Sequence, residues 1–379
     1  MCHASEIGKY RKPRVLLASQ RNIYGKHFRC ANYEFEDIIH QIDSVEFLSP
    51  QPSRWFQYGT RIASRLARSY AITINPGIPK TKIEQSYDLF FAVCTFPKDL
   101  LNLTGIQGWS DHCKTSICYL NEIWVAEMYK ERCLLKILSK FDYVIVNCSQ
   151  TVDAINEVIG GKSFHLAPGI DAILFCPYPE VPQRVIDVYS IGRRSEETHR
   201  ALMKMVKEHK IFYVYDTRIG SEVFNTDEHR LLLANMAKRS RYFIVNPGHI
   251  DRPDRTGGQS EISFRYFEGA ASGTIMIGEH PKSEEFGKLF NWLDAVIHLP
   301  FGSDKIKTII KELDRQPDRQ EKIRRNNMVQ SLLRHDWVYR WETILETAGL
   351  KPMPELLERK KRLRDLSNII EKRTVSLGT

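Results

Sequence analysis

A polar segment in the second half of the chain holds residue types that could bind an anionic group. It contains Gly257 and Gly258, then Ser260 and Glu261, and Glu268 seven residues after Glu261. Glycines ahead of a helix let the backbone approach a ligand, and the first free amide groups of the helix carry the positive end of its dipole. The segment therefore suits a diphosphate, although a purely structural turn could have the same sequence.

The elements that must position this segment follow a repeating pattern of short β-branched runs and helical stretches. This pattern is typical of βαβ units and a parallel sheet. The predicted strands lie at residues 15–18, 45–48, 89–93, 116–120, 143–147, 164–167, 186–191, 211–215, 242–245, 274–277 and 295–299. A helix is expected from about Ser260 to Ser272, and the chain from Lys305 is expected to be almost wholly helical. Ligands of such folds bind beyond the carboxyl ends of the strands, so the loops there should hold the site.

Three prolines within residues 177–182 can continue neither a helix nor a central strand, so they predict a linker. We expect an N-terminal lobe over 1–178, a C-terminal lobe over 184–335 and C-terminal helices over 336–379. The predicted fold class is α/β, with two Rossmann-like, doubly wound lobes that face a cleft and a helical C-terminal extension.

The composition, with 42% hydrophobic and 27% charged residues among 379, is that of a soluble globular protein. No apolar run approaches the roughly 18 residues of a membrane span. The N-terminal sequence MCHASEIGKYRKPR lacks the apolar core of a signal peptide. We therefore expect a cytoplasmic protein.

The formal net charge of +9 is unevenly spread. Residues 1–180 hold 20 Lys and Arg against 18 Asp and Glu, whereas the tail from Lys351 holds 8 against 4. The body is thus only mildly basic. Because no nucleic-acid-binding module and no interleaving of aromatic and basic residues occurs, no nucleic-acid partner is expected.

The eight cysteines all lie in the first half of the chain, and no two have Cys-x-x-Cys spacing. Cys94, Cys118 and Cys148 are in apolar runs, where a free thiol behaves as a small hydrophobe. We expect reduced thiols, no metal site and no cofactor.

Three stretches resemble the group 1 glycosyltransferases with the two-lobed GT-B fold. Residues 263–274, SFRYFEGAASGT, look like the donor-site helix of that family and are most similar to its spore-maturation-type branch. Residues 141–177 are similar to the last N-terminal-lobe strands and the crossing between lobes, and Gly192-Arg193 stands where the family has a Gly-Arg turn. The resemblance implies a metal-independent enzyme that moves a sugar from a nucleotide-diphosphate-sugar donor to an acceptor hydroxyl, with retention.

On this resemblance, Glu268 matches the carboxylate that accepts hydrogen bonds from the ribose hydroxyls, and Arg193 or Arg194 would neutralise the leaving diphosphate. Two alternatives stay open. Glu268 could pair with Arg265, and the two arginines could pair with the glutamates that follow them at 196 and 197. The predicted donor-binding set is Gly25, Arg193, Arg194, Arg200, Gly257, Gly258, Ser260, Ser263 and Glu268.

The sequence departs from the family pattern at two places. Many members have a glutamate eight residues before the ribose-binding one, where this chain has Ser260, so Glu261 would have to take the catalytic role near the sugar. Members also often have a lysine after the Gly-Arg turn, for which Arg200 or, less readily, His199 would stand in.

Acceptor-side candidates follow a predicted strand in the first lobe. Glu122 is a second catalytic candidate, as a base, and Asn121 and Trp124 flank it. Asn121 could instead simply cap the next helix. His112 is a weaker base candidate, and Gly25 either lets the backbone approach the donor or only turns the chain. The acceptor would be a glycan, a lipid-linked sugar or a small molecule.

The C-terminal tail has apolar residues at Leu356, Leu363, Leu366 and Ile370 around a basic cluster. A helix that packs one face on the body explains this pattern. Peripheral contact with anionic lipid through this basic helix is the alternative, and it would make the protein membrane-associated.

A non-catalytic protein is the alternative to an enzyme. A catalytically decayed GT-B-like chain that binds nucleotide sugars, or acts as a scaffold, would keep much of the same sequence. Turnover of a donor would discriminate between the two readings.

Overall fold

The computed structural model describes residues 12–217 and 220–375, and the chain divides into two compact units. The first unit contains the chain up to Ala167 and the segment Trp341–Leu357, and the second contains Pro168–Arg340 and the chain from Glu358. Cys2 and most of the N-terminal sequence that we inspected for a signal peptide lie outside the described residues.

The change of unit lies at Ala167–Pro168, before the prolines at 177–182 that predict a linker. The reason is a pair of backbone hydrogen bonds within the second unit. Ile170 N donates to His335 O at 2.9 Å, and Trp337 N donates to Ile170 O at 3.1 Å. Residues 336–379, which we expected to form a separate segment, are shared between the two units.

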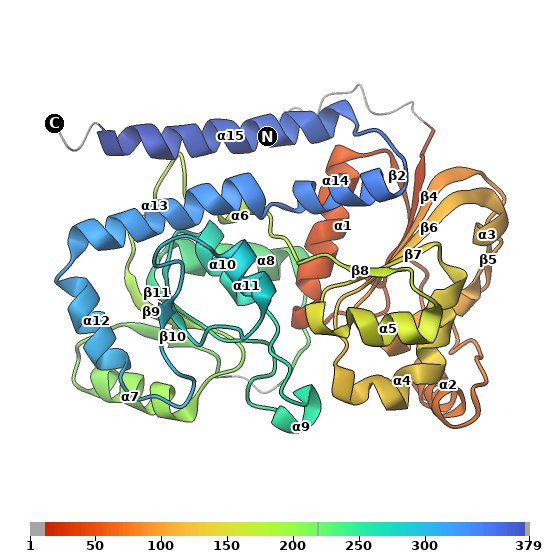
Figure 1. Ribbon diagram of the computed structural model, residues 1–379, viewed down its shortest axis with the longest axis horizontal. Coiled ribbons are helices and arrows are strands. Elements are labelled where there is room, and N and C mark those ends of the chain that lie inside the picture. The colour runs from red at the N-terminus through yellow and green to blue at the C-terminus, as the bar shows by residue number, and fades with distance from the viewer. Residues whose placement is uncertain (1–11, 218–219, 376–379) are drawn as a thin grey trace. The chain divides into compact units, whose positions relative to one another are not determined.

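The first unit contains a six-stranded parallel sheet in the order β2-β1-β4-β6-β7-β8 (Figure 1). The strands are β1 (Val15–Ala18), β2 (Val45–Leu48), β4 (Tyr87–Cys94), β6 (Cys113–Leu120), β7 (Tyr143–Val146) and β8 (Ser163–His165). All six were predicted. The central strand β4 is buried along nearly its whole length, as expected for a parallel sheet covered on both faces. Two further short strands, β3 (Thr81–Lys82) and β5 (Ile106–Gln107), pair apart from this sheet.

Helices α1 (Cys30–Ile42), α2 (Phe56–Tyr70), α3 (Trp109–His112), α4 (Met128–Leu135) and α5 (Val152–Ile159) lie between these strands along the chain. Short 3-10 helices occur at His27–Arg29, Pro97–Gly105, Val125–Glu127, Lys136–Lys140 and Ser149–Thr151. One part of the core joins α1 to the sheet and to the C-terminal segment, because the Phe35 ring contacts those of Phe91 and Trp341 at 6.0 and 6.5 Å between centroids.

The second unit contains a five-stranded sheet in the order β10-β9-β11-β12-β13, again parallel throughout. The strands are β9 (Ile186–Ser190), β10 (Tyr213–Tyr215), β11 (Ser240–Val245), β12 (Ile275–Gly278) and β13 (Ile297–His298). Its helices are α6 (Ala172–Phe175), α7 (Glu196–Lys207), α8 (Thr226–Lys238), α9 (Pro253–Thr256), α10 (Phe264–Ala271), α11 (Glu284–Leu289), α12 (Ile306–Asp314) and α13 (Pro317–Arg334). The predicted strands and the helical C-terminus are confirmed.

Each sheet reverses its strand order at one point. In the second unit the chain passes from β9 to β10 on one side and then crosses to β11 on the other side of β9. In the first unit β2 and β4 lie on opposite sides of β1 in the same way. A crevice forms where the connections leave in opposite directions, and ligands of open α/β sheets bind there, beyond the carboxyl ends of the strands.

The chain ends in α14 (Trp337–Thr347) and α15 (Pro354–Val375). The apolar residues Leu356, Leu363 and Ile370 of α15 are buried, so the packing explanation of this helix is the one that the structure shows. No helix in the described ranges is both long and apolar enough to cross a bilayer.

Candidate functional site

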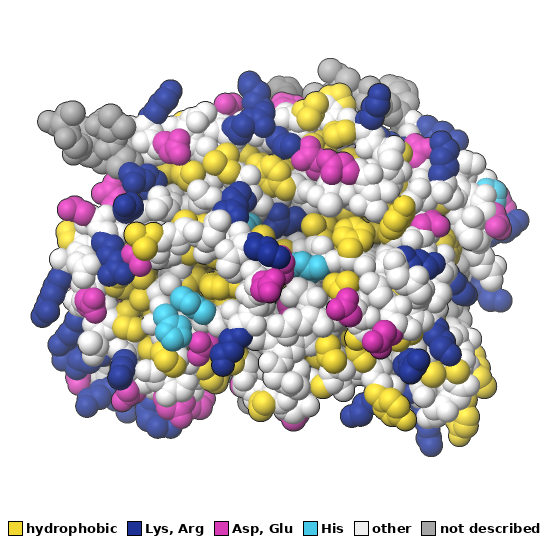
Figure 2. Space-filling model, viewed as in Figure 1, with side chains coloured by type: hydrophobic (Ala, Val, Ile, Leu, Met, Phe, Trp, Pro, Cys, Tyr) yellow, Lys and Arg dark blue, Asp and Glu magenta, His cyan; other side chains and the backbone are white. Residues whose placement is uncertain are grey.

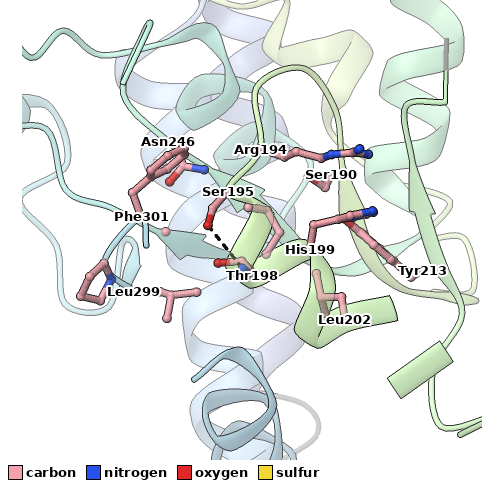
Figure 3. A pocket seen from close by; sticks show the side chains of 13 residues that line it. Ser190, Arg194, Ser195, Thr198, His199, Leu202, Tyr213, Asn246, Leu299 and Phe301 are labelled. Carbon is pink, nitrogen blue, oxygen red and sulfur yellow. Dashed lines mark hydrogen bonds between the residues drawn. The ribbon is translucent and has the colours of Figure 1, made fainter. Parts of the chain in front are cut away.

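A small pocket opens at the switch point of the second sheet, beyond the carboxyl ends of β9 and β11 (Figure 3). Ser190 ends β9, and Asn246 follows β11. Arg194, Ser195, Thr198 and His199 enter the pocket from the start of α7 and the turn before it, and Leu299 and Phe301 come from the loop after β13. The fold therefore brings polar side chains from separate segments to the edge where a ligand is expected.

The turn between β9 and α7 depends on Gly192. Its φ of 86° lies in the left-handed region, which glycine adopts without steric cost. Its N–H donates a 2.6 Å hydrogen bond to the Asp216 carboxylate, which follows β10. The predicted Gly-Arg turn is thus a tight turn at the carboxyl end of the first strand of this sheet.

The α7 N-terminus follows this turn directly. The buried Ser195 is its N-cap, and the Ser195 hydroxyl accepts a 3.3 Å hydrogen bond from Thr198 N. Thr198 Oγ1 in turn donates to Ser303 O at 2.7 Å, which ties the helix start to the loop after β13. A helix of 12 residues directs its positive dipole end at the pocket, where it would favour an anion.

Arg193 and Arg194 occupy different surroundings. Arg193 pairs with Asp251 at 2.8 Å, whereas Arg194 lines the pocket. Arg194 lies 3.6 Å from the Glu196 carboxylate, so one of the surface pairs left open by the sequence is present. The second, with Glu197, is replaced by a 3.1 Å hydrogen bond that Ser195 donates to Glu197.

Of the two residues that could stand in for the lysine after the Gly-Arg turn, His199 lines the pocket and Arg200 does not. Arg200 is exposed on α7 and is absent from the pocket lining. The His199 ring lies 3.1 Å from the Tyr213 hydroxyl. Burial and the nearby Arg194 charge lower the pKa of His199, which favours the neutral ring.

The two glycines expected ahead of the donor helix instead end a short helical turn. Gly257 and Gly258 have φ of 62° and 87° and follow α9. Helix α10 begins at Phe264, so the start near Ser260 was wrong. Ser263 precedes α10 but does not cap it through its side chain, because its hydroxyl donates to Asn246 O at 2.8 Å.

Glu261 is buried in the loop before α10. Its carboxylate accepts a 2.7 Å hydrogen bond from the Gln259 side chain, and its backbone carbonyl accepts one from Gly248 N at 3.0 Å. The neighbouring Ser260 hydroxyl accepts from Lys282 N at 3.1 Å. These contacts hold the loop in a defined shape after Asn246.

Glu268 is 1% exposed, and each of its carboxylate oxygens accepts from an arginine, one from Arg265 and one from Arg230. Burial alone would raise the pKa of Glu268, but the two positive charges outweigh burial and hold the pKa below its usual value. The pair with Arg265, which the sequence left open as an alternative, is therefore present. Arg230 comes from α8 and stacks on Phe175, and nothing in the sequence singles it out.

The acceptor-side residues of the first unit follow β6, but no helix begins there. The Asn121 side chain accepts a 2.8 Å hydrogen bond from Asn147, and the next helical residues start at Val125, so Asn121 is not a helix cap. Trp124 is 2% exposed, and its ring is unavailable as a stacking surface. Its Nε1 donates to the Glu122 carboxylate at 3.1 Å and so orients that side chain.

His112 lies at the amino ends of the strands of the first sheet, whereas Glu122 lies at their carboxyl ends. It ends α3, immediately before β6 begins, whereas Glu122 follows the end of that strand. The structure therefore does not bring these two base candidates together. Gly25 is exposed in the loop after β1, so it lies at the same carboxyl ends of the parallel strands as Glu122.

A buried polar network at the switch point of the first sheet was missed from the sequence. Arg29 forms a two-pronged ion pair with Asp99 at 2.7 and 2.9 Å and donates to Thr95 at 3.1 Å. Burial lowers the pKa of Arg29, but the Asp99 charge outweighs that effect and raises it overall. Partners 70 positions apart leave no local sequence signal.

The described cysteines are free thiols, most of them buried. In residues 12–217 and 220–375 there is also no group of three or more His, Cys, Asp or Glu side chains that could hold a metal ion.

Comparison with known proteins bears directly on the second unit. Residues 193–346 match the protein-family model described as glycosyl transferase-like. This stretch contains the Gly-Arg turn from Arg193, α7, α10 and all of the pocket lining except Ser190. No curated protein sequence matched the chain.

Solved structures of low sequence identity share the fold. Anabaena Alr3699/HepE, crystallised with UDP-glucose, is 14% identical with a TM-score of 0.50, over 88% of this chain and 99% of that one. An alpha-glucosyltransferase in complex with UDP-glucose and DNA containing an abasic site is 12% identical with a TM-score of 0.52, over 88% and 98%.

The resemblance to group 1 glycosyltransferases is thereby confirmed, and the chain has the GT-B fold. The match to the glycosyl transferase-like model is limited to residues 193–346, most of which lie in the second unit. The assignment to the spore-maturation-type branch stays a prediction.

Proposed function

We propose that this protein is a glycosyltransferase that moves a sugar from a nucleotide-diphosphate-sugar donor to an acceptor hydroxyl, with retention and without a metal ion. The observation that carries the proposal is the pocket at the switch point of the second sheet, whose lining residues from Arg194 onward lie within the glycosyl transferase-like stretch. UDP-sugars are the first donors to test, because UDP-glucose is bound in two of the similar structures.

The donor diphosphate is placed at the Gly192 turn and the α7 N-terminus. The helix amides and the Arg194 guanidinium supply the positive charge there. In the reaction the bond between the anomeric carbon and the diphosphate oxygen breaks, and the acceptor oxygen forms the new bond. The acceptor proton leaves with a base or with the diphosphate. Arg194 would stabilise the negative charge that grows on the leaving group.

Glu268 is assigned an indirect part in this site. Arg265, its partner, lies beside the Gly192 turn, since a Cβ added to Gly192 would be 3.9 Å from Arg265 Nε. Glu268 therefore positions Arg265 near the diphosphate. Each Glu268 oxygen keeps a further lone pair beside its bond to an arginine, so the predicted contact with the ribose hydroxyls is compatible with both ion pairs.

Glu122 and Glu261 remain the candidate catalytic carboxylates. Both are held in one orientation, Glu122 by the Trp124 indole and Glu261 by Gln259. Glu122 would accept the acceptor proton, and the acceptor is proposed to be a glycan, a lipid-linked sugar or a small molecule.

Calorimetric titration with UDP-, GDP- and dTDP-sugars, together with release of nucleoside diphosphate from each, tests the proposal. We expect saturable binding and release with one donor. Replacing Arg194 by Ala should weaken binding roughly ten- to a hundredfold, since a charge-assisted hydrogen bond contributes about 1.5–3 kcal/mol. Lys207→Ala, on the exposed last turn of the same helix, should bind as the parent does.

The outcomes separate the alternatives. No nucleotide binding by the parent protein would refute the proposal, whereas tight binding without any turnover would identify the non-catalytic alternative. Turnover that survives EDTA supports a metal-independent reaction, and the anomer of the product, read by NMR, shows whether the configuration is retained.

A further inference from the structure

Helix α2 of the first unit exposes aromatic and aliphatic side chains that no part of the described chain covers. Trp55, just before the helix, and Tyr58 are 65% and 66% exposed, and Ile62 one turn further is also exposed. These positions lie at i, i+3 and i+7, so they share one face of the helix. A run of exposed apolar residues of this kind is typical of an interaction site.

The opposite face of α2 carries the packing. Phe56, Ala63 and Ala67 are buried, with Ala63 and Ala67 inside the core of the first unit. Because this face already anchors the helix, the side chains of the outer face are not needed to hold it in place.

The surface continues beyond the C-terminal end of α2. Tyr70, Ile72 and Ile74 are exposed there. Helix α4 packs against α2 and adds Tyr129, which is 90% exposed, beside Lys130. We call Trp55, Tyr58, Ile62, Tyr70, Ile72, Ile74 and Tyr129, with the basic residues around them, the α2 surface.

The charged residues of the segment that contains α2 are all basic. From Phe47 to Ile83 the sequence contains no Asp or Glu, whereas it contains Arg54, Arg61, Arg65, Arg68, Lys80 and Lys82. The four arginines are exposed on or beside α2, and Arg68 pairs with Glu131 of α4. Figure 2 shows hydrophobic and basic side chains side by side over the region of α2 and α4.

We propose that the α2 surface binds the face of an anionic phospholipid bilayer. Trp and Tyr rings favour the zone between headgroups and acyl chains, because one part of each ring system is apolar and another part forms hydrogen bonds. Arginines alternating with them pair with lipid phosphates. A glycan binds to aromatic rings and does not need the surrounding positive charge. A protein partner would need acidic groups matched to these arginines, whereas an anionic bilayer presents phosphates at every position.

This assignment moves the membrane contact away from α15. There Leu356, Leu363 and Ile370 are buried, the exposed Leu357 and Ile369 lie twelve positions apart, and Arg359 is held at 2.8 Å by both Asp171 and Asp336. On α2 the exposed apolar residues include two aromatic rings and cluster on one face beside exposed arginines, which is the combination that interfacial binding requires. The inference does not rest on the proposed function.

Sedimentation with vesicles tests it. The full chain should sediment with vesicles of phosphatidylcholine mixed with phosphatidylglycerol and remain in the supernatant with phosphatidylcholine alone. Arg61→Glu/Arg65→Glu, and separately Trp55→Ala/Tyr58→Ala, should each lower the partition coefficient at least about tenfold. Matched controls on other surfaces, Lys361→Glu/Arg362→Glu on α15 and the exposed Phe224→Ala, should bind as the parent does.

Two results would overturn the inference. One is equal sedimentation with neutral and anionic vesicles, or a loss in the controls as large as in the α2 variants. The other is a dimer of the parent in sedimentation velocity that the α2 variants dissociate, because the surface would then bind a second copy of the chain. Circular dichroism of each variant checks that it is folded.

Discussion

Glu268 illustrates how strongly one side chain of this protein depends on its partners. It is buried between Arg265 and Arg230, and removing a charge from a buried pair leaves the other charges uncompensated. Glu268→Gln should therefore lower the free energy of unfolding by roughly 3–5 kcal/mol at neutral pH. Urea titration measures this, and Glu84→Gln, in an exposed pair with Lys82, should change it by at most about 1 kcal/mol.

The same residue gives a pH dependence with a definite sign. Because the folded-state pKa of Glu268 is below its ordinary value of 4.5, its contribution to stability is complete above that value and is lost as the pH falls toward the folded pKa. The difference in unfolding free energy between the parent and Glu268→Gln should be constant from pH 7 to about 5 and shrink below that range. A difference that grows on acidification would contradict the pairing.

Arg230 and Arg29 could not be predicted from the sequence for the same physical reason. Arg230 reaches Glu268 across 38 positions, and Arg29 reaches Asp99 across 70. The periodicity of a sequence predicts which residues share an element, but it does not predict which polar groups meet from different elements. Glu268 itself could be singled out only through the motif around it.

At the scale of elements, the Gly192 turn is the part of the proposed donor site with the strictest requirement. Gly192→Ala places a side chain in the left-handed region, at a cost of roughly 1–2 kcal/mol. The turn should relax away from Asp216, and nucleotide affinity should fall about tenfold. Calorimetry measures the affinity.

Gly287→Ala is the matched control for that substitution. Gly287 lies in α11, has no left-handed backbone, and a Cβ there meets nothing within 4 Å. Nucleotide affinity equal to that of the parent is expected. If Gly192→Ala bound the nucleotide as tightly as Gly287→Ala does, the turn would have no part in the donor site.

The central strands, such as β4 and β11, could be predicted from the sequence because each is a short apolar run that a parallel sheet buries on both faces. The sequence did not predict correctly whether a helix begins near Asn121 or near Ser260. Long-range bonds fix the chain there, from Asn147 to Asn121 and from Gly248 to Glu261, and they hold polar residues in loops that would otherwise favour helix caps.

At the scale of the whole molecule, the proposed donor site belongs to one of two units with separate cores. Nucleotide at about 100 times its dissociation constant stabilises the protein that binds it by about 2.7 kcal/mol. Hydrogen exchange should therefore slow in β9 and β11 of the second unit. Equal slowing in β1 and β4 of the first unit would contradict the assignment.

The net charge of +9 does not show where the unpaired positive charge of the molecule lies. Arg193, Arg230, Arg265 and Arg359 are all paired with carboxylates, so they add little free positive charge. The uniform stretch of positive charge is instead on and around α2 in the first unit. Net charge alone therefore indicates neither the donor site nor the α2 surface.

The most direct test of the central claim is a crystal structure of the protein soaked with UDP or with the nucleotide that calorimetry selects. We expect the diphosphate at the Gly192 turn, on the amides that start α7, with the Arg194 guanidinium in contact. A diphosphate bound anywhere else on the chain would contradict it.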